Sequence, residues 1–97
     1  MFARVSTFEG PVAKIDEGIQ YAETTILPRL KEVDGWKGVI SLVDRKSGKE
    51  LTITLWDSET ALRASEEQAN TMRAEAAHSA DQEVRQVDRY EVAIFEV

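Results

Sequence analysis

Residues 35–59 read GWKGVISLVDRKSGKELTITLWDSE, and this stretch decides the fold. Two segments rich in β-branched and aromatic residues, 36–43 and 50–56, flank a polar loop at 44–49 that contains Gly48. This pattern predicts a β-hairpin. Asp57 or Ser58 can then accept hydrogen bonds from the free N–H groups of a helix, and Glu59 favours the positive end of its dipole. The hairpin is therefore expected to lead directly into a helix.

That second helix is predicted to run from about residue 58 to Ala80. Its inward-facing stripe carries less side-chain volume than a helix of this kind usually does: Leu62, Ser65, Ala69, Met72 and Ala76. Missing volume either draws a helix close to the sheet or leaves a cavity. We expect a cavity, bounded by Met72 and reached from the end near Arg4.

The residues before the hairpin predict a strand followed by a helix. Residues 2–8 are rich in β-branched and aromatic side chains, and Gly10 and Pro11 end the strand with a turn. Pro28 should kink the following helix or end its regular part, because its ring clashes with the Thr24 carbonyl and it has no N–H to donate. Apolar residues recur at three- and four-residue steps, as on a buried helix face: Val12, Ile15, Ile19, Ala22, Ile26, Leu30 and Val33.

Residues 84–97 contain no Gly or Pro and predict one long last strand. The order strand, helix, strand, strand, helix, strand predicts an α+β fold of the ferredoxin-like, split βαβ type. In that fold a four-stranded antiparallel sheet carries both helices on one face. No linker or low-complexity tract interrupts the chain, so residues 1–97 are expected to form a single domain.

Both faces of the predicted hairpin are at least half apolar. In its second strand, residues of one face alternate with residues of the other: Leu51, Ile53 and Leu55 with Thr52, Thr54 and Trp56. A sheet with one face in water shows polar residues at alternate positions, so each face here needs a cover. The helices cover one face. Because a chain of 97 residues buries a limited share of its surface, a second subunit is expected on the other. We expect a homodimer.

Composition narrows the classes of function. The net charge of −6 and the lack of a Lys/Arg cluster argue against nucleic acid as a partner. One His and no Cys make a metal site improbable, and no phosphate loop or hydrolase motif is present. No apolar run approaches the length of a membrane span or a signal peptide. We expect a cytoplasmic protein that does not engage a membrane.

GWKG at residues 35–38 and WDSETA at 56–61 resemble the Gly-Phe-x-Gly and Trp-Glu-Ser-x-Glu-Ala motifs of the antibiotic biosynthesis monooxygenase-like family. The resemblance implies a dimeric α+β barrel in which two sheets pack face to face. The family includes cofactor-independent oxygenases, haem-degrading enzymes, isomerase-like enzymes and members of unknown activity. The fold by itself therefore does not select an activity.

Haem-degrading members of the family carry a pocket Trp, a first-strand Asn and an iron-binding His. The position of the Trp falls on Ser65 and that of the Asn on Ser6 or Thr7. The position of the His falls near Ala74, so His78 could replace it only in a shifted register. The other interpretation of His78 is an exposed side chain that the helix C-terminus favours.

The remaining candidates each have a structural and a functional interpretation. Trp56 either anchors the core or interface, or stacks on a ligand. Arg4 shares a strand face with Ser6; it either reaches solvent or pairs with Glu91, or it is a polar group beside an apolar cavity. Tyr21 lies about two positions off the buried stripe of the first helix, so its hydroxyl either lies at the helix edge or contributes to the pocket.

Together these features predict a pocket between sheet and helices for a small apolar or aromatic molecule. The resemblance implies an activity as a cofactor-independent monooxygenase, with no metal and no cofactor. The alternatives are a non-enzymatic ligand-binding or interaction module and, with less support, a haem-degrading enzyme. The candidate ligand-binding residues are Arg4, Ser6, Tyr21, Trp56, Ser65, Met72 and His78.

Overall fold

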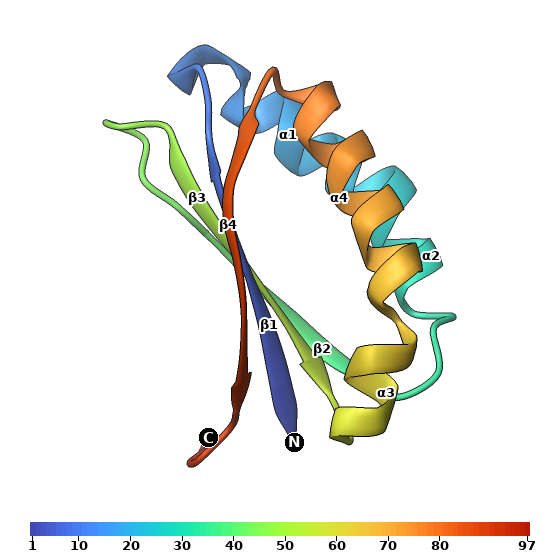
Figure 1. Cartoon of the computed structure of the whole chain (residues 1–97). Helices are drawn as coiled ribbons and strands as arrows, with labels where there is room; N and C mark the ends of the chain where they lie inside the picture. The colour runs from blue at the N-terminus through green and yellow to red at the C-terminus, as the bar shows by residue number, and fades with distance from the viewer.

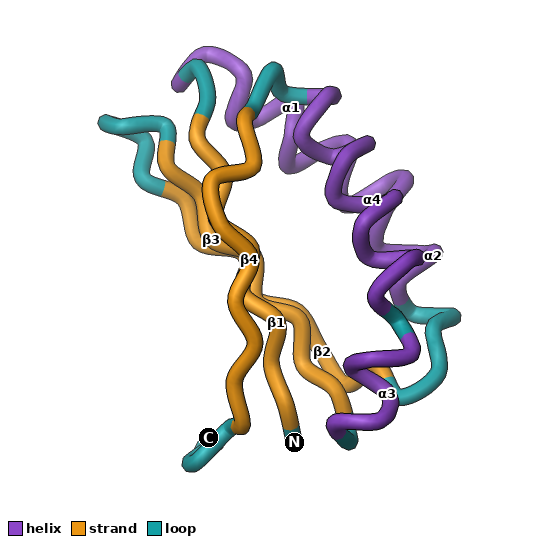
Figure 2. The backbone as a smooth tube through the Cα atoms, viewed as in Figure 1, coloured by secondary structure: helices purple, strands orange, loops and turns teal.

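A four-stranded antiparallel sheet forms one layer, and the helices all cover one face of it (Figures 1 and 2). The computed structural model describes all 97 residues. The sheet order is β2-β3-β1-β4, and the strands are β1 (Phe2–Glu9), β2 (Trp36–Val43), β3 (Lys49–Trp56) and β4 (Glu83–Glu91). The helices are α1 (Ile15–Tyr21), α2 (Leu27–Leu30), α3 (Glu59–Ala64) and α4 (Glu66–Ser79). This arrangement confirms the predicted ferredoxin-like fold.

The hairpin of β2 and β3 is the predicted one, with Trp36 opposite Trp56 and Val43 opposite Glu50. Gly48 closes its loop at φ +81°, where an added Cβ would lie 2.0 Å from the carbonyl oxygen of Gly10. Only glycine fits this position, because the positive φ and the close approach both exclude a side chain. The backbone N–H of Gly10 donates to the Gly48 carbonyl at 3.2 Å, which fixes the hairpin tip against the end of β1.

The first helical segment changes its pitch before Pro28, as expected. A 3₁₀ turn at Val12–Lys14 leads into α1, a π-helical segment at Ala22–Ile26 follows, and α2 then begins with Pro28 in its first turn. Proline is tolerated there because the first-turn N–H groups have no partner within the helix. The predicted stripe is wrong at Val12, which is exposed because it lies in the 3₁₀ turn and not in α1.

The second helix begins as predicted but is not continuous. Ser58 is the N-cap, and its Oγ accepts from the N–H of Ala61 at 3.1 Å. The predicted single helix divides at Ser65 into α3 and α4. The carbonyl of Leu62 explains the break, since it accepts from the Ser65 hydroxyl at 2.7 Å and from Arg4 Nη2 at 2.7 Å, leaving it less available to the N–H four residues ahead.

The last strand is shorter than predicted, because β4 ends at Glu91. Glu91 lies opposite Phe2, the first residue of β1, so no strand remains for residues 92–97 to pair with. Beyond the sheet the tail exposes Ile94 and Phe95. None of the helices combines the length and the apolar character that crossing a membrane requires.

The two faces of the sheet differ in chemistry. The side that faces the helices is mixed: the register places Arg4, Ser6, Thr52 and Thr54 there together with Phe8, Val39 and Trp56. The opposite, open face carries mainly apolar side chains: Ala3, Val5, Ile40, Leu42, Leu51, Ile53, Leu55 and Tyr90. At one end of the molecule the helices close onto the sheet through a buried cluster of Leu30, Trp56, Leu62 and Met72.

Candidate ligand-binding pocket

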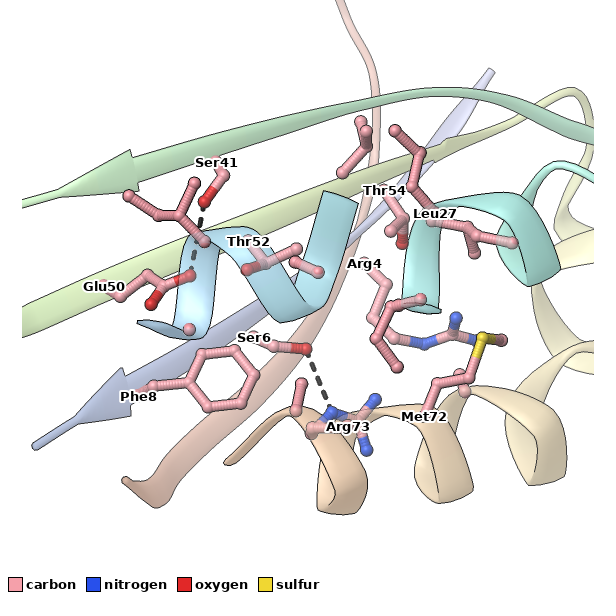
Figure 3. Close-up of a pocket in the computed structure, with 18 of the residues that line it drawn as sticks. Arg4, Ser6, Phe8, Leu27, Ser41, Glu50, Thr52, Thr54, Met72 and Arg73 are labelled. Atoms are coloured by element: carbon pink, nitrogen blue, oxygen red, sulfur yellow. Dashed lines mark hydrogen bonds between the residues drawn. The ribbon is translucent and has the colours of Figure 1, made fainter. Parts of the chain in front are cut away.

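A cavity of about 310 Å³ lies between the helix-facing side of the sheet and the helices (Figure 3). Its floor comes from β1, β2 and β3, one wall from α1, the π-helical segment and α2, and the other wall from α4. Twelve of its 22 lining residues are hydrophobic, so most of the wall favours an apolar ligand.

The cavity exists because both helices present small side chains to it. Ala69 and Ala76 line it from α4, and Gly18 and Ala22 line it from the other helix. Met72 reaches inward between the two alanines, as expected. The small side chains therefore leave a cavity, and the helices do not move close to the sheet to fill it.

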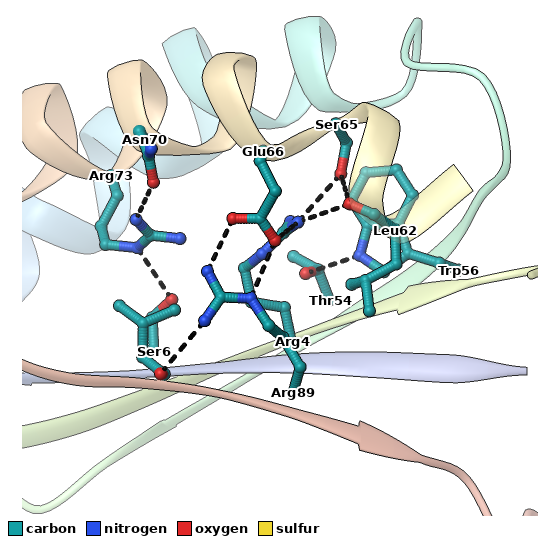
Figure 4. A network of polar contacts seen from close by, with 11 residues as sticks. Arg4, Ser6, Thr54, Trp56, Leu62, Ser65, Glu66, Asn70, Arg73 and Arg89 are labelled. Carbon is teal, nitrogen blue, oxygen red and sulfur yellow. Dashed lines mark hydrogen bonds and ion pairs between the residues drawn. The ribbon is translucent and has the colours of Figure 1, made fainter. Parts of the chain in front are cut away.

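Arg4 is the most deeply buried charged residue of the pocket, with 2% of its surface exposed. Its Nη2 donates to the Leu62 carbonyl at 2.7 Å, to Ser65 Oγ at 3.1 Å and to Glu66 Oε1 at 2.8 Å (Figure 4). Its Cζ lies 5.5 Å from the ring centroid of Trp56, within cation–π range. Its Nε and Nη1 atoms are buried and have no hydrogen-bond partner.

The interpretation of Arg4 as a solvent-reaching residue or a partner of Glu91 is wrong. Glu91 lies opposite Phe2 in the sheet, and Arg4 lies opposite Arg89. Residue 4 also shares the helix-facing side of β1 with Ser6, which directs its side chain under α3 and α4. Arg4 is thus the polar group beside an apolar cavity.

Glu66 joins Arg4 to the edge of the sheet. Arg89 Nη2 donates to Glu66 Oε2 at 2.6 Å and Arg89 Nε donates to Oε1 at 2.8 Å. These hydrogen bonds, together with the one from Arg4, outweigh partial burial and lower the pKa of the Glu66 carboxyl to about 2. Glu66 is therefore ionised at neutral pH and serves as a fixed negative charge, not as a proton carrier.

Arg73 is a pocket residue that the sequence analysis did not identify. Its Nε donates to Ser6 Oγ at 3.0 Å, and its Nη1 donates to Asn70 Oδ1 at 2.7 Å (Figure 4). Burial, and then the charge of Arg4, lower the pKa of the Arg73 guanidinium. The available signal was its four-residue spacing from Ala69, which places it on the same side of α4.

The other candidate residues fall into two groups. Trp56 is fully buried, lines the cavity and donates from Nε1 to Thr54 Oγ1 at 3.0 Å. Ser65 is buried outside the lining and accepts from Arg4. Tyr21 and His78 are not part of the lining: the Tyr21 hydroxyl contacts Glu75 at 3.5 Å, and His78 is exposed on α4.

The end of the cavity away from Arg4 is acidic. Glu50 lines it and is held by hydrogen bonds from Gln82 Nε2 at 2.8 Å and from Ser41 Oγ at 3.2 Å. Glu23 also belongs to the lining. Arg4 and Glu50 lie at different places along the sheet. Arg4 lies opposite Thr54, whereas Glu50 lies opposite Phe8, four residues further along β1.

The pocket does not fit a haem bound through an imidazole. The lining contains no His, and Ala74, where the family position of the iron ligand falls, is exposed. No group of three or more His, Cys, Asp or Glu side chains is arranged to hold a metal ion. The residues present offer hydrogen bonds, positive charge and apolar surface.

The fold is that of the antibiotic biosynthesis monooxygenase-like structures. One of these is a monooxygenase of Streptomyces coelicolor, from the gene ActVA-Orf6, in complex with nanaomycin D (TM-score 0.69, 16% identity, 99% of this chain and 92% of that chain). Another is the heme-degrader MhuD of Mycobacterium tuberculosis with two hemes bound (TM-score 0.67, 18% identity, all of both chains). At these identities the likeness extends to the fold alone.

In sequence, the chain is similar to the uncharacterized protein Rv2558 of Mycobacterium tuberculosis, with 38% identity over 77 residues. The match covers 79% of this chain and 33% of that protein. The chain thus spans about a third of the length of the curated relatives it matches. No protein-family model matches it.

Proposed function

We propose that this chain binds a small, largely aromatic molecule in the cavity between the sheet and the helices. The observation that carries the proposal is the cavity itself, about 310 Å³ with a mainly hydrophobic lining. An apolar cavity of about 150 Å³ accommodates benzene, so this one matches a ligand of two or three fused rings. The apolar side chains of Ile19, Ala69 and Met72 form walls against which such a ligand would pack.

The binding unit is a homodimer that forms through the open face of the sheet. Ile40, Leu42 and Tyr90 are 42%, 49% and 55% exposed on that face, although their neighbours in the sheet are apolar. A contiguous apolar surface of this kind is typical of a protein–protein interface. The second copy would also cover the apolar tail at Ile94 and Phe95, which the single chain leaves in water.

Calorimetric titration with β-naphthol tests the binding proposal. Ala69→Leu fills the cavity, and we expect it to abolish binding while the protein stays folded. Ala74→Leu is the matched control, because Ala74 lies on α4 but is exposed. Binding that survives Ala69→Leu, or that Ala74→Leu removes equally, would place the ligand elsewhere. A loss of stability of a few kcal/mol in Ala69→Leu would mean that the space is already closed.

A second candidate function is cofactor-independent monooxygenation, supported by the shared fold with a monooxygenase whose structure was solved with nanaomycin D. In this reaction an anthrone loses a ring proton, and its carbanion reacts with dioxygen. One oxygen atom becomes the new carbonyl of an anthraquinone, and the other leaves as water. The cavity would exclude water, and Arg4 would stabilise the developing oxyanion.

Oxygen consumption with anthrone separates this candidate from simple binding. An oxygenase would convert anthrone faster than buffer does, and Ala69→Leu would return the rate to that of buffer. Tight binding without any acceleration would leave a non-enzymatic binding module as the function.

A further inference from the structure

We infer that the ligand of this pocket is an aromatic carboxylate whose anionic group is held by Arg4 and Arg73. The inference rests on the proposed function, because it specifies the chemical class of the ligand for the same cavity. It places the carboxylate at the end formed by β1 and α4 and the aromatic body along the apolar walls.

The first observation is the incomplete hydrogen bonding of Arg4. All of its contacts are made by Nη2, so the three N–H groups on Nε and Nη1 have no acceptor, although the side chain is almost completely buried. Buried donors without partners are rare and costly. A carboxylate oxygen is the acceptor that forms the strongest hydrogen bonds with a guanidinium.

In this proposal the ligand reaches these donors by displacing Met72. This side chain lines the cavity and belongs to the same buried cluster as Trp56, over whose ring Arg4 lies. Methionine is unbranched and adapts its rotamer at low cost. A ligand that enters the cavity can therefore displace Met72 and reach Arg4 without moving the backbone.

The second observation is an excess of positive charge at this end. Arg4 and Arg89 both pair with Glu66, and Arg73 lies within electrostatic range of all three, in a protein whose net charge is −6. The other carboxylate that acts on this group is Asp88, beside Arg89. Arg73 lines the cavity. Its Nε donates to Ser6 and its Nη1 donates to Asn70, which leaves Nη2 without a protein partner. An anionic ligand would balance the surplus charge.

The opposite end of the cavity fixes the orientation. Glu50 would repel a carboxylate placed there, whereas it can accept a hydrogen bond from a ligand hydroxyl. The change from positive charge near Arg4 to negative charge near Glu50 therefore favours one of the two directions in which an elongated acid could lie.

The test compares β-naphthoate with its neutral counterpart β-naphthamide by calorimetric titration. The two have the same shape, so their affinity ratio isolates the anionic group. We expect the wild-type protein to prefer β-naphthoate by about tenfold or more. Arg73→Gln should reduce this ratio to about threefold or less while β-naphthamide binds as before. Arg63→Gln is the control, since Arg63 is exposed, pairs with Glu59 and does not line the cavity.

Arg4→Gln is the second variant, and circular dichroism verifies that it is folded. A purely structural role of Arg4 would weaken both probes equally, whereas recognition of the anion lowers the ratio alone. Equal affinities in the wild-type protein, or a preference retained in both Arg73→Gln and Arg4→Gln, would overturn this inference and leave the binding proposal intact. Failure of both probes and of β-naphthol to bind would overturn the proposed function together with it.

Discussion

The two faces of the sheet differ in what covers them. The face covered by the helices carries polar residues such as Arg4 and Ser6 among apolar ones such as Phe8 and Trp56, while the face left open is mainly apolar, with Ile40 and Leu42 exposed. A sheet face in water usually shows polar residues at alternate positions. Under the proposed function, the covered face holds a cavity with polar groups for a ligand, and the open face offers apolar surface to a second copy.

The largest expected effect comes from placing a charge on the open face. Leu42→Asp should convert a dimer at micromolar concentration into a monomer, because it buries an unpaired carboxylate in the interface. Sedimentation velocity measures the change, and Lys46→Asp in the exposed hairpin loop is the control. A wild-type protein that is already monomeric at that concentration would contradict the function assigned to this face.

The next effect compares the closed and the open part of the helix-facing side. Leu62→Ala removes a side chain from the buried cluster and should cost about 3–4 kcal/mol of unfolding free energy. Ile19 lies at the cavity wall, where part of its surroundings is already empty. Ile19→Ala should therefore cost about 1–2 kcal/mol of unfolding free energy. Chemical denaturation measures both. Equal losses would mean that the cavity is filled in solution by rearranged side chains.

The charge network should produce a smaller, pH-dependent effect. The pKa of Glu66 falls from 4.5 to about 2 on folding, so its contribution to stability is complete above about pH 4.5 and is lost as the pH falls towards 2. Because the carboxylate is partly exposed to solvent, we expect about 1–2 kcal/mol. Glu66→Gln should remove this dependence in urea titrations between these pH values.

Glu67→Gln is the matched control for this measurement, since Glu67 is the exposed neighbour on the same helix. If Glu66→Gln and Glu67→Gln show the same pH profile, the bonds from Arg89 and Arg4 contribute nothing measurable in solution.

The smallest expected effect is the response to haem. Hemin should produce only weak spectral changes without a stoichiometric endpoint, because no imidazole lines the cavity. Absorbance in the Soret region follows the titration. A sharp one-to-one endpoint that disappears in His78→Ala would show that α4 can rotate its exposed His inward and would contradict the site described here.

Much of the fold could be predicted from local chemistry. The alternation and the turn residues of 36–56 predicted the hairpin almost to the residue, and Pro28 marked the change of helical pitch. The stripe of small residues on the second helix predicted the cavity. These features depend on neighbours a few positions apart, which a sequence shows directly.

The features that the sequence analysis did not predict share a different cause. The helix break at Ser65 requires the Arg4 guanidinium, which approaches from 61 positions away in the chain. The early end of β4 depends on where β1 begins. Arg73 joins the pocket because Ser6 on a distant strand accepts its N–H. In each case the partner is brought near only by the folded sheet.

The sequence by itself therefore determined the order of elements, the small side chains of the helix wall and the presence of Arg4 and Trp56. The tertiary structure alone decided that Arg4 is buried with unpaired donors, that Glu66 lies between two arginines, and that a mainly apolar face of the sheet stays uncovered. The physical reason is the range of the interactions: periodicity and turn chemistry act within a few residues, whereas charge pairing and burial depend on segments that meet only after folding.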